Sequence, residues 1–394
     1  MTQHVDQIAV IGAGIGGLTA AIALCDSGFQ VTIYEQSSTL TEIGAGIGVP
    51  PNACKVMRQL GLLDQLEAVG VADTYGSYRH ARTGTEMRLT DFTKAREQYG
   101  APQLRLHRWD LQQILADGLS RRASDNIKLG HRLEGVDARS NGVDLAFANG
   151  DTARAQIVIA ADGIRSKVRQ ALFNGDAPAF TGFVAYRGLV PIEDIERDMR
   201  VDTSSFDGGL MIRNYLVRRH SLMNINATVR NDTWEAESWR AHGQKKDLLA
   251  AFAAFYPGMR RLLAAIPDQA LFKWGLFLRS RLDHWVKGRV ALLGDAAHPM
   301  LPYLGQGGAM AIEDGMILAR ALAACASPEE GLQCYEATRM DRAYAVTDAS
   351  AAMGKIFHMD AADDYAQERD FSGGRLPGLL TYDAVTAPLN LSRR

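Results

Sequence analysis

Hydrophobic positions near the start of the chain form short continuous runs. Residues 8–11 are all apolar, residues 20–24 continue an apolar run of helical character, and residues 31–35 form a second strand-like run that ends at Glu35. A short apolar run bounded by turn residues is typical of a buried parallel strand. The pattern therefore predicts a strand, a tight turn, a helix and a second strand at the N-terminus.

The same patterns predict the elements of the rest of the chain. Residues 42–51 form a loop rich in glycine and proline, and Asn52 is expected to cap a helix that runs to residue 60. Asn141-Gly142 and Asn149-Gly150 predict two hairpin turns. Further helices are predicted at 108–123, 245–255, 258–265, 307–325 and 328–357. Strands are predicted at 75–79, 86–89, 127–129, 143–147, 157–160, 182–190, 204–206, 210–217, 221–229 and 289–294, and residues 366–394 are expected to be irregular.

The order of these elements predicts a domain that is interrupted by another. We expect an α/β fold in which a Rossmann-like nucleotide-binding domain, with a mixed and mainly parallel sheet, surrounds an α+β domain with an antiparallel sheet. The first domain is expected to comprise residues 1–72, 103–177 and 273–394, the last part including C-terminal helices. The inserted domain is expected to comprise residues 73–102 and 178–272. A site built from both domains would lie at their junction.

Composition and charge exclude several classes of function. Hydrophobic residues make up 47% of the chain and charged residues 22%, and the net charge is −2, so neither nucleic acid nor an anionic membrane is expected as a partner. The four cysteines show no paired spacing, so we expect free thiols and no metal site. Residues 7–25 are uncharged, but their four glycines and the lack of a basic region before them argue against a signal or membrane segment. We expect a cytoplasmic protein.

The turn after the first strand carries a nucleotide-binding pattern. Gly12, Gly14 and Gly17 have the spacing G-x-G-x-x-G, and Glu35 follows Gly17 by 18 residues. In a strand–turn–helix unit this spacing indicates a dinucleotide whose pyrophosphate lies at the helix N-terminus. Gly12 would permit the turn, Gly14 would let the backbone approach the phosphates, and Gly17 would let helix and strand pack closely. A glycine-rich helix packed on a sheet is the alternative, and it leaves Glu35 unexplained.

A second motif lies at residues 158–169. A predicted strand ends at Asp162-Gly163, and Ser166 is a possible cap of the helix that follows. The turn suits contact with a pyrophosphate, and an ordinary strand end followed by a basic helix start is the alternative. Three basic residues accompany it: Arg165, Lys167 and Arg169.

Two further motifs adjoin each other late in the chain. Asp295 directly follows a buried strand, where a carboxylate can approach a ribityl or ribose hydroxyl, with helix capping as the alternative. Gly305, Gly307 and Gly308 then expose backbone N–H groups where a helix begins. A helix N-terminus stabilises negative charge, such as the charge on the ring of a reduced flavin.

In their order and separation, these motifs resemble one family closely: the single-component, class A, FAD-dependent aromatic hydroxylases of the p-hydroxybenzoate hydroxylase fold. The resemblance covers residues 6–350 and is strongest to the branch acting on salicylate, 3-hydroxybenzoate and 6-hydroxynicotinate. It implies an NAD(P)H-dependent flavoprotein monooxygenase that hydroxylates a small aromatic or N-heteroaromatic acid or phenol through a flavin C4a-hydroperoxide. FAD would be the cofactor, with NADH or NADPH as transient co-substrate and O2, in a monomer or homodimer.

The resemblance also implies roles for particular residues. Four would hold the adenosine half of FAD: Gly12, Gly14, Gly17 and Glu35. Others would contact the rest of the FAD: Arg108, Asp162 and Asp295, with Asp162-Gly163 matching a motif that is also associated with NAD(P)H. The loop 44–49, which contains Gly46, and the loop with Gly305, Gly307 and Gly308 would flank the isoalloxazine ring.

The substrate pocket is where the resemblance is weakest. Tyr215 and Tyr303 match positions that meet the substrate in relatives and are the candidate catalytic residues, with ordinary packing tyrosines as the alternative. Arg187 and Arg213 are candidates for pairing with a substrate carboxylate, with surface positions as the alternative. Residues 46–50 and position 303 contain no histidine, unlike 6-hydroxynicotinate hydroxylases. We therefore expect a tyrosine or an already ionised substrate in place of a histidine base, and a structural role for His298.

Other functions stay open at this stage. They are a flavoprotein reductase or desaturase that inserts no oxygen, a non-catalytic FAD-binding scaffold, and a monooxygenase of 6-hydroxynicotinate or of a larger, antibiotic-type substrate. Stimulation of NAD(P)H oxidation by a small aromatic acid, with one oxygen atom recovered in the product, would separate the leading hypothesis from these.

Overall fold

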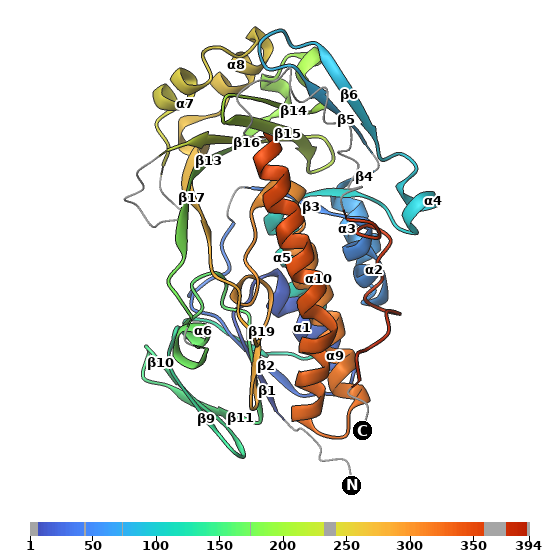
Figure 1. Cartoon of the computed structure of the whole chain (residues 1–394), viewed down its shortest axis with the longest axis vertical. Coiled ribbons are helices and arrows are strands. Elements are labelled where there is room, and N and C mark those ends of the chain that lie inside the picture. The colour runs from blue at the N-terminus through green and yellow to red at the C-terminus, as the bar shows by residue number, and fades with distance from the viewer. Residues whose placement is uncertain are drawn as a thin grey trace.

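We describe the protein from a computed structural model, in which residues 7–42, 45–72, 74–173, 175–231, 242–357 and 376–391 are described. The chain forms an elongated molecule with a large sheet toward each end and long helices beside and between them (Figure 1). Gly44, the first residue of the predicted loop 44–49, lies outside the described residues.

The first large sheet is mainly parallel, with β1 at its centre between β12 and β2. All four residues of β1 are buried, as expected for a strand covered on both faces. Only the pairing of β18 with β19 is antiparallel, so the predicted mixed, mainly parallel sheet is confirmed. In spatial order the strands are β18 (Val286–Lys287), β19 (Val290–Leu292), β12 (Ile157–Ala160), β1 (Ile8–Ile11), β2 (Val31–Tyr34) and β8 (Ile127–Lys128).

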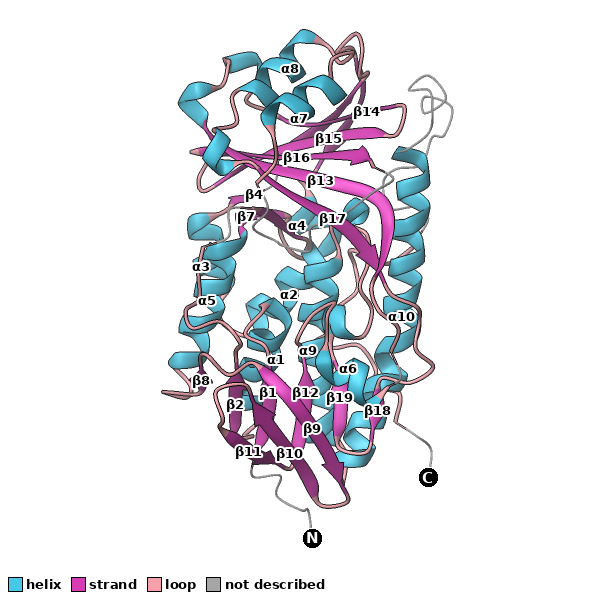
Figure 2. Cartoon of the chain, turned by 90° about the vertical axis from the view of Figure 1, so that its left-hand side faces the viewer, coloured by secondary structure: helices cyan, strands magenta, loops and turns pink. Residues whose placement is uncertain are grey.

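Helices pack around this sheet, and one of them extends to the other end of the molecule (Figure 2). The crossing of α1 and α9 is so close that a Cβ atom on Gly315 would lie 2.7 Å from the backbone nitrogen of Ala20. The helix α10 runs beside α9 and ends where Phe357 packs on Phe206 of the second large sheet. The helices of this part are α1 (Ile15–Asp26), α2 (Pro51–Gln59), α3 (Leu63–Val69), α5 (Arg108–Ser120), α6 (Lys167–Leu172), α9 (Gly307–Ala324) and α10 (Pro328–Phe357), with the 3-10 turns η4 (Gly294–Ala296) and η5 (Pro302–Leu304).

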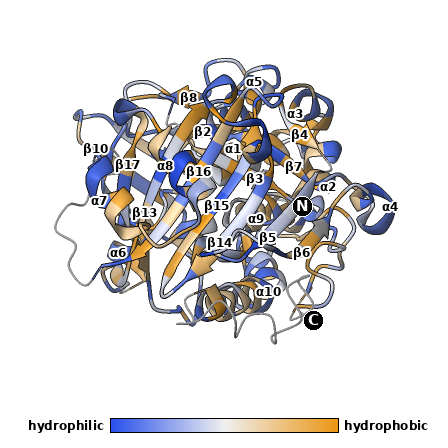
Figure 3. Cartoon of the chain, turned by 90° about the horizontal axis from the view of Figure 1, so that it is seen from above, coloured by the Kyte–Doolittle hydropathy of each residue, from blue (hydrophilic) through white to orange (hydrophobic). Residues whose placement is uncertain are grey.

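The second large sheet is antiparallel except for the pairing of β14 with β5. The predicted antiparallel sheet is therefore confirmed. The strands are, in spatial order, β17 (Phe272–Leu278), β13 (Ala179–Pro191), β16 (Leu222–Arg230), β15 (Leu210–Val217), β14 (Asp202–Asp207), β5 (Tyr75–Arg79) and β6 (Glu86–Asp91). Beside it lie α4 (Ala95–Tyr99), α7 (Lys245–Ala251), α8 (Pro257–Ala264), η1 (Ile192–Asp194), η2 (Arg197–Met199) and η3 (Asp268–Ala270). Figure 3 looks onto this end, with the largely hydrophilic α4 at the rim.

Two small antiparallel sheets complete the fold. One consists of β11 (Thr152–Ala155), β10 (Gly142–Phe147) and β9 (Leu133–Arg139), and its two turns fall at the Asn-Gly pairs, which confirms both predicted hairpins. The other consists of β3 (Gly46–Val49), β7 (Leu104–His107) and β4 (Val71–Ala72) and lies between the two large sheets (Figure 2). The predicted loop 42–51 is therefore wrong for residues 46–49, which form β3 because their backbone pairs with β7. This pairing brings Gly46 next to the second large sheet.

The predicted capping role of Asn52 is wrong. The helix α2 begins at Pro51 and its cap residue is Pro50, because a proline fits the first turn of a helix, where its missing N–H costs nothing. Asn52 is fully buried, and its side-chain amide donates a hydrogen bond to Glu313 on α9 (2.7 Å).

Candidate functional site

A large cavity lies between the two large sheets. Its volume is about 1270 Å³, and it is lined both by the turns at the ends of β1, β12 and β19 and by the inner face of the second sheet. Pockets for one small molecule usually measure roughly 300–1,000 Å³. The cavity therefore has room for a dinucleotide together with a second, smaller molecule.

The glycines of the N-terminal turn differ in what surrounds them. Gly12 has φ +104°, and a Cβ atom on Gly17 would lie 2.1 Å from the carbonyl oxygen of Gly12, so turn geometry and close packing demand both residues. Gly14 lines the cavity and has no atom within 4 Å of a Cβ position. It is also the cap residue of α1, which receives no capping side chain. The first turn of α1 is thus open toward the cavity at Gly14, where an anion would be stabilised.

Glu35 lies directly against this turn. Its carboxylate accepts hydrogen bonds from the backbone N–H groups of Ala13 (2.8 Å) and Ser37 (2.9 Å), and the residue lines the cavity. A carboxylate can accept further bonds on its remaining lone pairs. The structure therefore places Glu35 beside the glycine turn, as the predicted contact to a ribose hydroxyl requires.

Asp162 and Gly163 line the cavity where β12 ends. One carboxylate oxygen of Asp162 accepts a hydrogen bond from the N–H of Lys167 (2.8 Å), while the other is buried without a hydrogen-bond partner among the described residues. Burial raises the pKa of Asp162, although hydrogen bonds from Ser166 and the start of α6 oppose the shift. The second oxygen is free to accept a bond from a ligand.

The basic residues after Asp162 do not act together. Arg165 and Lys167 line the cavity, but Arg169 is fully buried and donates hydrogen bonds to the carbonyl oxygens of Ala296 and Ala297 (both 3.2 Å). The prediction that Arg169 suits pyrophosphate contact is wrong, because its buried guanidinium donates hydrogen bonds to backbone carbonyl oxygens instead. Ser166 caps α6 by accepting from the N–H of Arg169, as predicted.

Arg108 and Asp295 place opposite charges at the middle of the cavity. Both line it, and neither side chain makes a hydrogen bond or ion pair with another described residue. Asp295 is accessible, but only from the cavity, so burial within the protein raises its pKa, with His298 and Arg108 opposing the shift. Burial lowers the pKa of Arg108, and Asp295 opposes that shift. Two charged groups without close partners leave this part of the cavity ready for a polar ligand.

The loops predicted to flank a flavin ring meet each other in the structure. Gly305 has φ +65°, and Gly307 and Gly308 form the first turn of α9, where a Cβ atom on Gly308 would lie 3.1 Å from Ile47. Gly46 is equally confined, since a Cβ atom there would lie 2.7 Å from the ring of Tyr215. The turn 305–308, the loop around Gly46 and Tyr215 therefore enclose one part of the cavity.

Tyr215 lies on β15 at the face of the second sheet that bounds the cavity. Burial raises the pKa of its phenol, and the nearby guanidinium groups of Arg187, Arg213 and Arg105 oppose the shift. The guanidinium carbon of Arg105 lies 5.4 Å from the centroid of the Tyr215 ring. Tyr215 is thus a protonated phenol at neutral pH, surrounded by cations.

Tyr303 is more of a packing residue than Tyr215. It is 3% exposed, its ring contacts Phe357 of α10, and a Cβ atom on Gly354 would lie 2.5 Å from it. It lines the cavity nevertheless, and burial raises the pKa of its phenol. It forms part of a small hydrophobic cluster that joins the cavity wall to the end of α10.

Arg187 and Arg213 both line the cavity, and neither guanidinium makes a hydrogen bond or ion pair with another described residue. The guanidinium of Arg187 lies over the ring of Trp274 (4.6 Å to the centroid), and its Nε is buried without a hydrogen-bond partner. Burial lowers the pKa of Arg187. The surface alternative therefore does not hold for Arg187.

Several residues of this wall were not anticipated. Arg105 is buried and forms an ion pair with Asp202 (3.5 Å), Asn224 accepts a hydrogen bond from the N–H of Gly46 (2.7 Å), and Asn226 has a buried side-chain oxygen without a partner. A signal for the two asparagines exists in the sequence. They alternate along β16, and the register places them opposite Tyr215 and Arg213 of β15.

No helix among the described residues is both long and apolar enough to cross a membrane. In the same part of the chain, no group of three or more histidine, cysteine and acidic residues is arranged to hold a metal ion. His298 is buried, and its Nε2 lies 2.6 Å from a carboxylate oxygen of Asp314, which accords with the expected structural role.

Comparison with known proteins gave consistent matches. The model of the family described as "FAD binding domain" matches residues 6–213 and 272–350. A 3-amino-4-hydroxybenzoate 2-monooxygenase from Streptomyces platensis is 35% identical over 363 residues, 91% of this chain and 90% of the relative. A 6-hydroxynicotinate 3-monooxygenase from Pseudomonas fluorescens is 34% identical over 346 residues, 86% of this chain and 88% of the relative. The crystal structure of HpxO from Klebsiella pneumoniae with FAD and uric acid superposes with a TM-score of 0.86 at 28% identity, over 98% of both chains.

Proposed function

This chain belongs to the family of FAD-dependent aromatic monooxygenases, and from this premise we propose that it hydroxylates a small aromatic or N-heteroaromatic acid. The observation that carries the proposal is Arg187, a cavity-lining guanidinium without a carboxylate partner among the described residues. A buried cation of this kind requires an anion, and a substrate carboxylate would supply it. NADH or NADPH and O2 are the expected co-substrates.

The residues present fit FAD. Gly14 leaves open space at an uncapped helix start, Asp162 offers an unpartnered carboxylate oxygen, and Arg108 and Asp295 face the middle of the cavity without partners among the described residues. When bound, FAD supplies the acceptance of a hydride from the nicotinamide and the activation of O2 for transfer to an aromatic ring.

We assign the cofactor-binding roles along the cavity. Gly12, Gly14, Gly17 and Glu35 would hold the adenosine half, and Arg108, Asp162 and Asp295 would contact the central part. The other end would hold the isoalloxazine ring, between Gly46 on one side and the turn with Gly305, Gly307 and Gly308 on the other. The support is that these residues lie along one continuous cavity or form its turns.

The wall opposite the proposed ring position would bind the substrate. Arg187 and Arg213 would pair with its carboxylate, while Arg105, which is already paired with Asp202, would add to the positive potential. The guanidinium of Arg187 packs on the ring of Trp274, which restricts the orientation of the guanidinium. A substrate oxygen would be favoured in its ionised form here, because three guanidinium groups lie near it.

We propose that Tyr215 contacts an oxygen substituent on the aromatic ring of the substrate, which donates electrons to the ring once it is ionised. Since its phenol is protonated, it would donate a hydrogen bond to an ionised substrate oxygen or pass a proton to and from it. Tyr303, by contrast, would form the apolar wall of the substrate position, because its ring packs on Phe357 and Gly354.

The test is a panel of aromatic acids added to the purified, FAD-loaded protein. The panel includes 3-amino-4-hydroxybenzoate, 6-hydroxynicotinate, 3-hydroxybenzoate and salicylate, with the amide of each as the neutral control. We expect one acid to stimulate NAD(P)H oxidation strongly and to yield a product containing one atom from 18O-labelled O2. NAD(P)H oxidation that no acid stimulates, or that a neutral amide stimulates equally, would contradict the proposal. The other functions open at the sequence level predict stimulation without oxygen insertion, no NAD(P)H oxidation, or a preference for larger substrates.

A further inference from the structure

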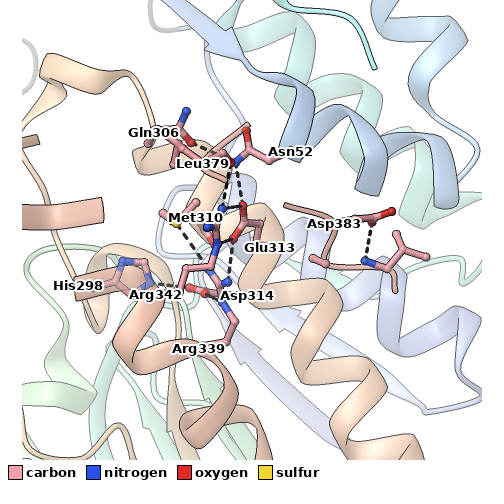
Figure 4. Close-up of polar contacts among 12 residues, drawn as sticks. Asn52, His298, Gln306, Met310, Glu313, Asp314, Arg339, Arg342, Leu379 and Asp383 are labelled. Atoms are coloured by element: carbon pink, nitrogen blue, oxygen red, sulfur yellow. Dashed lines mark hydrogen bonds and ion pairs between the residues drawn. The ribbon is translucent and has the colours of Figure 1, made fainter. Parts of the chain in front are cut away.

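A cluster of four charged side chains, three of them fully buried, lies between α9 and α10 (Figure 4). Glu313 and Asp314 come from α9, and Arg339 and Arg342 from α10. Arg339 donates to Glu313 and to Asp314 (both 2.7 Å), and Arg342 donates to both carboxylate oxygens of Glu313 (2.8 Å each). Glu313, Asp314 and Arg339 are 0% exposed. We call these four residues the charge cluster.

The charge cluster is electrically balanced. Burial alone would raise the pKa of Asp314, but His298 and Arg339 outweigh this and lower it to about 2. Burial opposes the charge of Arg339, but the neighbouring carboxylates of Glu313 and Asp314 outweigh this and raise its pKa. Asp314 and Arg339 therefore both remain ionised at neutral pH.

The charge cluster contacts three segments that line the cavity. Asp314 accepts a hydrogen bond from the N–H of Gly294 (3.0 Å), which precedes Asp295. Arg342 donates to the carbonyl oxygen of Leu379 (3.2 Å). Leu379 and Asp295 both line the cavity.

Asn52 links the charge cluster to the third segment. Its amide nitrogen donates to Glu313 (2.7 Å) and to the side-chain oxygen of Gln306 (3.1 Å), as the labelled side chains in Figure 4 show. Gln306 lies inside the turn 305–308 and lines the cavity. Both residues are buried.

The four charged residues themselves do not line the cavity, as far as the described residues show. They cannot touch a ligand, and their effect on one must pass through Gln306, Gly294 and Leu379. An apolar contact would hold α9 and α10 together about as well, because buried ion pairs must offset a large desolvation cost. Apolar residues, however, could not make directional hydrogen bonds to three separate turns.

We propose that Asn52 and the charge cluster form a positioning device that holds the turn 305–308 and the turn at Gly294-Asp295 in one fixed geometry. The inference rests on the proposed placement of FAD, in which the two turns meet the isoalloxazine ring and the chain next to it. The charge cluster anchors both turns to the same rigid pair of helices. Asn52 and Asp314 are therefore positioning residues: Asn52 acts on the cofactor through the side chain of Gln306, and Asp314 through the backbone of Gly294.

The substitution Asn52→Leu tests this with little collateral change. Leucine has a similar volume, and Glu313 keeps its bonds from Arg339 and Arg342. The bond to Gln306 is lost, which is expected to raise the Kd of the apoprotein for FAD about two- to tenfold. We also expect shifted absorption bands of the bound flavin and unchanged secondary structure. Both are measured without any aromatic substrate, so the outcome does not depend on the proposed substrate class.

The control is Glu336→Gln on α10. Glu336 is also a carboxylate that accepts hydrogen bonds, but its partners are the backbone N–H groups of Trp285 and Val286 and the ring of His284, at and beside the far edge strand. We expect lower stability of the apoprotein in urea, with an unchanged Kd for FAD and an unchanged flavin spectrum. If Asn52→Leu behaves in this way too, the positioning role is refuted.

A second variant removes the same bond from its other end. Gln306→Met deletes the acceptor and leaves Asn52 bound to Glu313. It is the deciding variant if Asn52→Leu does not fold. We expect the same direction of change in the Kd for FAD and in the flavin spectrum, and unchanged values for both would overturn the proposal.

Discussion

Replacing Arg187 by methionine should weaken recognition of the substrate without lowering the stability of the fold. The Arg187 guanidinium makes no hydrogen bond or ion pair with another described residue and is held only over the Trp274 ring, at 4.6 Å. Removing it therefore leaves no buried carboxylate without a partner. Such an unpaired charge is the usual reason that loss of a buried charged residue destabilises a protein. Methionine fills a similar length with apolar atoms against the same indole ring.

The size of the effect follows from the missing ligand bond. A hydrogen bond to a charged group contributes about 1.5–3 kcal/mol, so kcat/KM for an aromatic carboxylate should fall about 10- to 150-fold. For the neutral amide of the same acid, the fall should stay below about threefold, because that ligand offers no charge to Arg187. Burial lowers the pKa of Arg187, which means that the protein environment disfavours its charge. The variant should accordingly be as stable as the wild type, or more stable.

The assay measures NAD(P)H oxidation stimulated by the best acid of the panel and by its amide, alongside FAD content and urea unfolding. Arg261→Met is the matched control, because Arg261 is 53% exposed and pairs only with Glu196 at the surface (2.8 Å). Its kcat/KM for both compounds should equal that of the wild type. Equal losses for acid and amide in Arg187→Met, or no loss for either, would refute the assignment of Arg187 as the carboxylate partner.

Four further outcomes are expected. Gly14→Val should abolish FAD retention while the apoprotein unfolds within about 1 kcal/mol of wild type, because a Cβ atom there meets only open space; retained yellow colour would contradict this. Gly17→Ala should instead lower the free energy of unfolding by about 1–3 kcal/mol, measured in urea, because its Cβ atom would collide with the Gly12 carbonyl. Tyr215→Phe should reduce the hydroxylation rate about tenfold without loss of flavin, whereas an unchanged rate would remove Tyr215 from the site. The folded-state pKa of Asp314 is about 2, below the usual value of 3.8, so its contribution of about 2 kcal/mol is present above pH 4 and lost as the pH falls toward 2. Urea titrations of Asp314→Asn should lack this part of the acid dependence, and an acid dependence identical to that of the wild type would contradict the value.

The sequence was informative wherever the signal is local. The glycine spacing at residues 12–17 reports backbone geometry, and the structure shows why: Gly12 has φ +104° and Gly17 almost touches its carbonyl oxygen. The helical patterning at 307–325 and 328–357 predicted α9 and α10 to within a residue. Such features depend on neighbours within one or two turns of the chain.

The sequence could not reveal partners that the fold brings together from far apart. Asn52 has the identity of a good helix cap, yet it serves Glu313, 261 residues away, because α2 and α9 pack side by side. Arg169 belongs to a basic motif, but its guanidinium is taken by carbonyl groups near residue 296. Arg105 gives no local sign that it is paired with Asp202. In each case, a residue type permits several roles and only tertiary packing selects one.

The strand order of the first large sheet has a consequence for biosynthesis. The strand β1 leaves the ribosome first, but its neighbour β12 ends at Ala160 and the next strand, β19, ends at Leu292. Asp295 and the turn 305–308 follow later still. At roughly 5–20 residues per second, the nascent chain waits on the order of 15–60 s before the proposed cofactor site is complete. During that interval the apolar strand β1 and the helix α1 lack their later partners, so efficient production should depend on chaperones that shield them and on FAD supplied only after synthesis is nearly finished.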